Sequence, residues 1–395
     1  MGKKYFVWLI SLVFCFFLSC KIADDYYYNL DSTSLWGVAV DDLDLDGAVD
    51  IVVTSSHVDS WHYYVSVFLN DINSPGSFLL SAKFRLKGPK REYPESIALG
   101  DLNDDGYFDI ATHLDSAIFI LFQDSTQPGQ FFDPLKIAVG KYISSIAIGD
   151  LNEDGFSDLA ISGNGPNLSI LFQDSLNPGN FFPLVSLGIT SSSVAIGDLN
   201  GDFINDIAVT EVRNSGNVHL LFQDPAVPGS FIVTMDLDAG AQPTDVKMED
   251  LDKDGNLDLV VANAGTPDNY RSGSISVFLQ DSANPGEFLD ADNYKLSDSP
   301  NIISIGDLND DGFLDIAAAG GRITILFQDI SSVGTFFSPN KIMSSSDDTW
   351  SVAIGDMNED NFNDLTYTED VVKIQWQNPA SPGNFSRKTT IYDPD

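Results

Sequence analysis

Apolar and polar residues alternate in short segments along most of the chain. Ser145–Gly149 and Ser351–Gly355 show this pattern, which has the two-residue period of a strand with one buried face. An acidic stretch follows each such segment, and a run of small and β-branched apolar residues comes next, as in Asp109–Thr112 and Asp258–Ala262. These runs also predict strands, and no segment combines a helical apolar stripe with helix caps.

A third predicted strand in each unit ends in L-F-Q-D or a variant of it, and a P-G-x-F turn or a variant leads into a fourth short extended run. The unit recurs roughly every 50 residues. The acidic stretches begin at Asp42, Asp101, Asp150, Asp198, Asp250, Asp307 and Asp356. Four strands in each of seven units predict an all-β fold, a seven-bladed β-propeller of four-stranded antiparallel blades. We interpret the repeated Leu-Phe pair and the phenylalanine of the turn as packing contacts between blades.

The seven units fill residues 35–395, so we expect a single propeller there and no second domain. Residues 20–34 are predicted to be an N-terminal tether. Residues 28–37 resemble the end of a fourth strand, but residues 385–392 also have the pattern of a fourth strand. The sequence leaves open which of the two closes the last blade.

The first twenty residues have the pattern of a signal peptide. Lys3 and Lys4 precede an almost uncharged apolar run that is short for a membrane span. The sequence F-L-S-C at residues 17–20 resembles the lipobox of bacterial lipoproteins, in which cleavage leaves an acylated cysteine, although Phe17 stands where leucine is usual. We therefore predict a lipoprotein-type signal peptide at residues 1–19 and acylation of Cys20. An ordinary secretory signal or an uncleaved anchor is the alternative.

This interpretation predicts a lipid-anchored protein of the cell envelope. Lys21, which follows the predicted acylated cysteine, favours the outer membrane or cell surface, and a secreted or periplasmic location is the alternative. The formal net charge of −38 repels nucleic acid and anionic lipid surfaces. We therefore expect no nucleic-acid partner, and membrane contact through the lipid anchor only.

The acidic stretches follow the pattern D-x-[DN]-x-D-G-x-x-D. Positions 1, 3, 5 and 9 offer side-chain oxygens, position 7 offers a backbone carbonyl, and glycine at position 6 permits a left-handed turn. An oxygen-only ligand set favours Ca²⁺ over zinc or copper. An EF-hand would need Glu at position 12 and flanking helices, whereas strands begin here at position 9. The alternative is a set of acidic turns that cap strands without metal.

The sequence thus predicts up to seven calcium sites, one in each loop. The predicted ligands are Asp42, Asp44, Asp46 and Asp50; Asp101, Asn103, Asp105 and Asp109; Asp150, Asn152, Asp154 and Asp158; Asp198, Asn200, Asp202 and Asp206; Asp250, Asp252, Asp254 and Asp258; Asp307, Asn309, Asp311 and Asp315; and Asp356, Asn358, Asp360 and Asp364.

Two loops depart from the pattern at position 6. Asn361 is acceptable there because asparagine enters the left-handed region more easily than most residues. Phe203 should cost on the order of 1–2 kcal/mol if the same backbone is kept. We therefore expect the fourth loop to bind calcium weakly or not at all.

The succession I-A-I-G-D-L-N-x-D-G-x-x-D, then L-F-Q-D and P-G-x-F, resembles the FG-GAP or VCBS repeat family in all seven units. The same fold forms the head of the integrin α subunit. The resemblance implies that the acidic loops join the first and second strands of each blade on one face of the propeller. It also implies that ligands meet the other face or the mouth of the central channel.

The connections between second and third strands would lie on that other face, and those of the first and fifth units are long. Trp61, Tyr63, Tyr270 and Arg271 are our candidate ligand-binding residues there, with blade-edge packing of Trp61 and Tyr63 as the alternative. No nucleophile-elbow, zinc-protease or P-loop motif is present, and we assign no catalytic residue.

We expect a calcium-stabilised, non-catalytic surface or periplasmic propeller that binds an extracellular protein or glycan. Two alternatives stay open. One is a calcium-dependent lyase or hydrolase that acts on polysaccharide, and the other is a structural subunit of an envelope complex.

Overall fold

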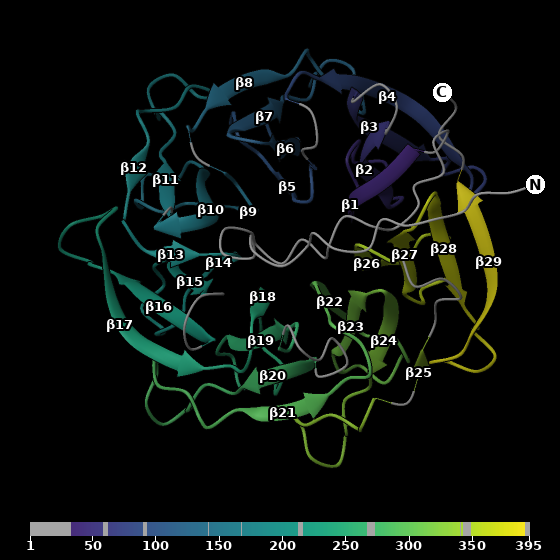
Figure 1. Cartoon of the computed structure of the whole chain (residues 1–395). Helices are drawn as coiled ribbons and strands as arrows, with labels where there is room; N and C mark the ends of the chain where they lie inside the picture. The colour runs from purple at the N-terminus through teal and green to yellow at the C-terminus, as the bar shows by residue number, and fades with distance from the viewer. Residues whose placement is uncertain are drawn as a thin grey trace, which may run out of the picture.

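The computed structural model describes residues 33–57, 62–89, 93–140, 142–166, 168–211, 216–266, 273–339, 341–342 and 349–391. Seven antiparallel sheets surround a common centre in the manner of propeller blades (Figure 1). The fold is all-β, and none of the described residues forms a helix long and apolar enough to span a membrane. The predicted seven-bladed β-propeller is therefore confirmed.

The strands of each blade follow the chain from the centre outward. Blades 1 to 3 contain β1 (Thr33–Asp41), β2 (Asp50–His57), β3 (His62–Asn70) and β4 (Phe78–Leu86); β5 (Ile97–Gly100), β6 (Asp109–Leu114), β7 (Ala117–Leu121) and β8 (Leu135–Ala138); and β9 (Ser145–Gly149), β10 (Asp158–Pro166), β11 (Ser169–Leu171) and β12 (Val185–Ser186). A short extra strand, β13 (Thr190–Ser191), pairs with the far end of β10.

Blades 4 to 7 have the same order without an extra strand. They contain β14 (Val194–Gly197), β15 (Asp206–Thr210), β16 (Asn217–Gln223) and β17 (Phe231–Asp238); β18 (Pro243–Glu249), β19 (Asp258–Asn263), β20 (Ser274–Phe278) and β21 (Asp292–Lys295); β22 (Ile302–Gly306), β23 (Asp315–Gly320), β24 (Arg322–Leu326) and β25 (Lys341–Ile342); and β26 (Val352–Gly355), β27 (Asp364–Thr368), β28 (Val372–Gln377) and β29 (Phe385–Ile391).

The last blade is completed by its own chain segment. β29 is its fourth strand, which answers the question that the sequence left open. The ring closes where β1 of blade 1 meets β26 of blade 7. Hydrogen bonds cross this seam from Val38 N to Ser351 Oγ (3.3 Å), from Asn70 Nδ2 to Met357 O (3.1 Å) and from Thr368 Oγ1 to Trp36 O (3.2 Å).

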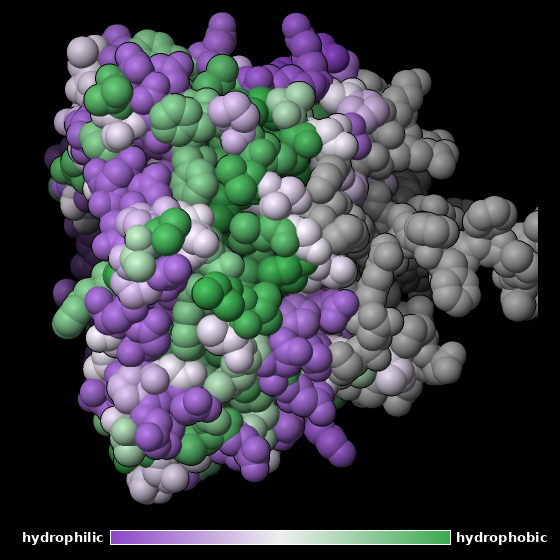
Figure 2. All heavy atoms as spheres, turned by 90° about the vertical axis from the view of Figure 1, so that its left-hand side faces the viewer, coloured by the Kyte–Doolittle hydropathy of each residue, from purple (hydrophilic) through white to green (hydrophobic). Residues whose placement is uncertain are grey.

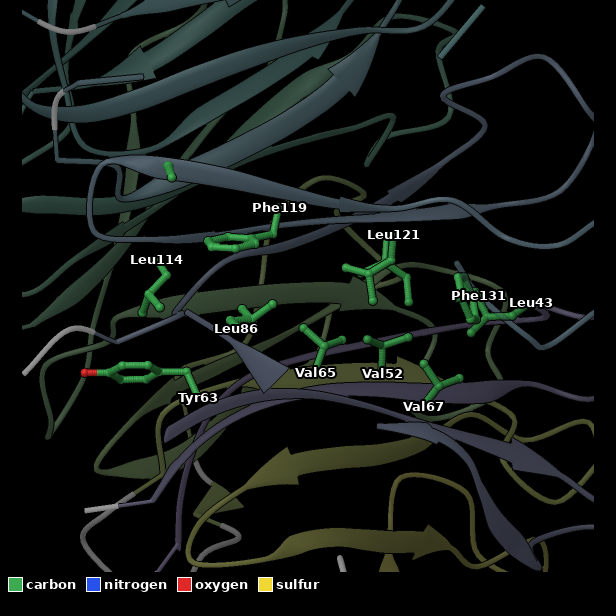
Figure 3. Close-up of a cluster of buried hydrophobic side chains, with 12 residues drawn as sticks. Leu43, Val52, Tyr63, Val65, Val67, Leu86, Leu114, Phe119, Leu121 and Phe131 are labelled. Atoms are coloured by element: carbon green, nitrogen blue, oxygen red, sulfur yellow. The ribbon is translucent and has the colours of Figure 1, made fainter. Parts of the chain in front are cut away.

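The core consists of apolar clusters between neighbouring blades. Figure 3 shows the cluster between blades 1 and 2, where Val52 and Val65 lie opposite Phe119 and Leu121. Ile51, the neighbour of Val52 on β2, instead packs toward blade 7. Successive side chains of a strand point to opposite faces, so a central strand buries both of its faces. This explains why the second strands, such as β6 and β27, are buried at nearly every position.

The phenylalanine of L-F-Q-D packs across the blade boundary, as the sequence predicts. A Cβ added at Gly229, in the P-G-x-F turn of blade 4, would lie 3.1 Å from Phe172 of blade 3. The same pairing joins Gly179 to Phe122 and Gly383 to Phe327. Each turn thus lies against the blade before it, and its glycine leaves room for the aromatic ring.

An exposed apolar residue follows the turn at the same place in six blades and lies on the rim. These residues are Leu79, Phe132, Phe182, Ile232, Leu289 and Phe337. Figure 2 shows a band of apolar surface along the rim between two polar borders.

Candidate metal loops and the opposite face

All seven acidic loops connect the first strand of a blade to its second strand. The first loop, for example, lies between Asp41 at the end of β1 and Asp50 at the start of β2. Because every first strand runs in the same direction from the opposite face, the loops lie together on one face of the propeller. This is the placement that the family resemblance implies.

The loops share one backbone conformation with two left-handed residues. Position 4 has a φ between 56° and 76°, and position 6 has a φ between 67° and 99°. In the second loop these residues are Asp104 and Gly106. Left-handed residues turn the chain tightly enough for the side chains at positions 1, 3 and 5 to reach backbone groups of the same loop.

Hydrogen bonds within each loop hold these side chains in place. In the second loop, Asp101 Oδ1 and Oδ2 accept the N–H groups of Asp105 (3.2 Å) and Gly106 (2.8 Å). Asn103 Oδ1 also accepts the Asp105 N–H at 3.0 Å, and Asp105 Oδ1 accepts that of Tyr107 at 3.1 Å. The bond from the position 6 N–H to the position 1 carboxylate recurs in all seven loops.

The aspartate at position 9 is the most buried of the predicted ligands. Asp109 is fully buried, with Oδ2 accepting Leu102 N at 2.9 Å and Oδ1 accepting Gln123 N at 2.7 Å. Burial raises the pKa of its carboxyl group to about 7, although these two N–H groups favour the charged form. Nearby Asp105 and Asp101 raise this pKa further. The position 9 carboxyl groups of the other six loops have the same shift, with burial as its main cause.

Among the described residues, three carboxylates lie close enough together to share one calcium ion in two of the seven loops. In the first loop, Asp42, Asp44 and Asp50 offer oxygens that all lie within 4.8 Å of one another, and Asp250, Asp252 and Asp254 do the same in the fifth loop. Two oxygens bound to one Ca²⁺ at about 2.4 Å can be at most about 4.8 Å apart. Hard oxygen donors at this separation suit Ca²⁺, and a cation would also offset the repulsion between the carboxylates.

A residue to which the sequence assigned no role joins each loop to its blade, and it is a glutamine in six blades and Asn70 in blade 1. Gln123 Nε2 donates to Phe108 O (2.8 Å), and Gln123 Oε1 accepts Gly129 N in the P-G-x-F turn (2.5 Å). Its Nε2 also donates to Leu43 O in the loop of blade 1 (3.0 Å). Equivalent bonds to a loop carbonyl and a turn N–H recur at Gln173, Gln223, Gln280, Gln328 and Gln377, and at Asn70. The recurrence of this residue in L-F-Q-D was the available signal.

The fourth loop keeps the common backbone despite Phe203. Phe203 has a φ of 67°, and its N–H donates to Asp198 Oδ2 at 2.8 Å, as glycine does in other loops. Its side chain is 96 % exposed, so no packing within the described chain offsets the strain. Gly201 occupies the left-handed position 4, where the other loops have larger residues, and relieves strain there instead. Weak binding by this loop stays a prediction.

Three aromatic rings meet at the opposite end of the innermost strands. The ring of Trp36 on β1 lies 4.2 Å from that of Tyr93 and 5.1 Å from that of Trp350, measured between centroids. Trp36 is buried and donates its Nε1–H to Ser56 Oγ at 2.8 Å, whereas Tyr93 and Trp350 are partly exposed. Tyr93 and Trp350 precede the first strands of blades 2 and 7. This aromatic cluster therefore lies near the centre, on the face away from the acidic loops.

Of the four candidate ligand-binding residues, Tyr63 is the one that the structure describes. Tyr63 is fully buried in the cluster between blades 1 and 2, and its hydroxyl donates to Pro89 O at 2.8 Å. Burial of Tyr63 favours the alternative role in packing, because the neighbouring blade covers the end of β3. Trp61, Tyr270, Arg271, the signal peptide and Cys20 lie outside the described residues.

His219 is the one described histidine that contacts two carboxylates. Its Nδ1 lies 2.6 Å from Asp236 Oδ1, and its Nε2 lies 3.3 Å from Glu211 Oε2. Both ring nitrogens therefore have carboxylate partners within the protein. Such an imidazole has no nitrogen available for a substrate, so this cluster gives no support to an enzymatic role.

The protein is thus a seven-bladed β-propeller in which each blade carries one acidic loop between its first and second strands. A protein-family model described as FG-GAP-like repeat matches residues 42–112, 198–261, 250–318 and 307–366, which together cover more than half of the chain. Each match begins at position 1 of an acidic loop. The chain belongs to the family of FG-GAP-like repeat proteins. A search of curated proteins found no match.

Proposed function

We propose that this chain is a calcium-stabilised, non-catalytic propeller that binds an extracellular protein or glycan. In this proposal the acidic face has a structural role and the opposite face binds the partner. The observation that carries it is the cluster of Trp36, Tyr93 and Trp350 near the centre of the opposite face. Aromatic side chains combine a large apolar surface with a polar group, which suits both protein partners and sugar rings.

The structural role of calcium is supported by the bonds around each loop. In blade 2, the position 9 carboxylate accepts one N–H from its own loop and one from Gln123, just after the third strand. The glutamine of L-F-Q-D then connects the loop to the turn and, in blade 2, to the neighbouring blade. A cation held by the loop would therefore stabilise the blade and its contact with the next blade.

We further propose that acylated Cys20 anchors the propeller to the cell envelope, at the outer membrane or cell surface. The strong negative charge supports this arrangement, because it opposes direct contact with anionic lipid and leaves the anchor as the means of attachment. Residues 20–32 would then separate the first blade from the membrane.

The test is a glycan and extracellular-protein binding array with the soluble form, residues 21–395, in calcium and in chelator. We expect calcium-dependent binding that Trp350→Ala weakens at least tenfold. Trp376→Phe is the matched control, because Trp376 lies at the end of β28 next to the acidic face. Equal binding by the two variants would place the partner elsewhere, and no binding to any protein or glycan would contradict the proposal.

A further inference from the structure

His113 faces the boundary between blades 2 and 3. It is the fifth residue of β6, two positions after Ala111, so both side chains point to the same side of the sheet. Ala111 belongs to the apolar cluster that also contains Ile143 and Ile161 of blade 3. Ile118, which pairs with His113 across the sheet, belongs to the same cluster.

The imidazole of His113 is buried without a hydrogen-bond partner. The residue is 1 % exposed, and neither Nδ1 nor Nε2 has a partner in the described structure. A buried polar group without a partner is costly, and a buried charge without one is costlier. The neutral imidazole can stay in this position, whereas imidazolium would place two unsatisfied N–H donors and a charge in the seam.

Blades 1, 3 and 7 place a short hydroxyl residue at this position of the second strand and use it to bridge the boundary, whereas blades 5 and 6 have Ala262 and Ala319 there. Ser162 of blade 3 donates to Ser192 O of blade 4 at 3.0 Å. Thr368 of blade 7 donates to Trp36 O of blade 1 at 3.2 Å, and Thr54 of blade 1 donates to Pro94 O of blade 2. Blade 2 lacks this bridge because His113 occupies the position.

We propose that His113 makes the seam between blades 2 and 3 labile to acid, so that protonation of its imidazole opens this seam while the other seams stay closed. This inference does not depend on what the propeller binds. It assigns a regulatory element to the fold, because a propeller whose ring opens at one seam changes the shape of both faces.

The direction of the effect follows from the environment of the imidazole. Burial lowers the pKa of His113 to about 4, from an ordinary value of 6.5 when the seam is open and hydrated. The closed seam is therefore fully stable above pH 6.5 and loses stability as the pH falls toward 4. Among the described residues, β5, β7 and β9 carry no titratable side chain, and the flanking segments contribute Glu95, Asp115 and Tyr142. β6 and β10 carry one acidic side chain each, Asp109 and Asp158, at the end of the strand next to the acidic loops.

Hydrogen exchange at pH 7 and pH 5 tests the proposal, with rates corrected for intrinsic exchange. Both measurements use saturating calcium, so that the loop carboxylates stay in one state. The pKa values of His113 in the closed and open states, about 4 and 6.5, set the size of the effect. The equilibrium constant for opening of residues 109–121 and 143–171 should be about twentyfold larger at pH 5 than at pH 7. His113→Thr should remove this rise, and His62→Gln, a change at a partly exposed histidine of blade 1, should retain it.

An equal rise in wild type and His113→Thr would overturn the proposal, as would a rise spread over all seven blades. If His113→Thr does not fold, the wild-type protein still decides the question by NMR titration of its four histidines. One imidazole should stay neutral down to about pH 4. Four imidazoles that all titrate near pH 6.5 would contradict the proposal.

Discussion

Replacement of Gln123 by leucine should destabilise the propeller by about 3 kcal/mol. The side chain makes three hydrogen bonds, to Phe108 O, Leu43 O and Gly129 N, and the residue is buried. Leucine has a similar volume but leaves two carbonyls and one N–H without partners. Each unsatisfied buried group costs about 1–3 kcal/mol, so the lower end of that range already gives about 3 kcal/mol in total.

Gln173→Leu provides an internal comparison. Among the described residues, the Gln173 side chain bonds only to Ser157 O (2.7 Å) and Gly179 N (2.9 Å), so its replacement should cost about two thirds as much. Gln127→Leu, at an exposed turn residue, should change stability by less than about 0.5 kcal/mol. Urea unfolding in saturating calcium measures all three variants. A Gln123→Leu protein as stable as Gln127→Leu would refute the role of this glutamine as the link between loop, turn and neighbouring blade.

Two further predictions concern the loops. In chelator, the melting temperature should fall as the pH rises from 4 to 7. The position 9 carboxyl groups have pKa values of about 7 when folded and 3.8 when unfolded, so the stability that they contribute below pH 3.8 is lost as the pH rises through 7. A rise in melting temperature over this range would contradict the burial of these groups as neutral acids. Phe203→Gly should raise stability by about 1–2 kcal/mol and strengthen calcium binding by the fourth loop, as measured by thermal unfolding at several calcium concentrations, and an unchanged protein would mean that Phe203 is not strained.

The repeated part of the fold could be predicted from the sequence. Strand alternation, the acidic loops and the P-G-x-F turns are local patterns, and they recur seven times in register. The predicted strand bounds are close to those in the structure: the strand predicted at Asp109–Thr112 is β6, which extends to Leu114. The assignment of Phe385–Ile391 to the last blade could not be decided, because it depends on pairing with β28 rather than on local pattern.

The candidate site was predictable only in part. The loop residues lie next to one another in sequence, so their placement in one turn follows from the spacing. Burial of Tyr63, in contrast, depends on the neighbouring blade, and an aromatic residue near a long connection has the same local pattern whether exposed or covered. The cluster of Trp36, Tyr93 and Trp350 joins three blades, and no local pattern links residues so far apart in the chain.

The central claim is that the acidic loops hold calcium, and native mass spectrometry after removal and re-addition of calcium tests it most directly. We predict about six ions bound per chain at moderate calcium, with a seventh at higher concentration for the fourth loop. Asp109→Ala should remove one ion from that number. A folded chain that binds no calcium would contradict the account.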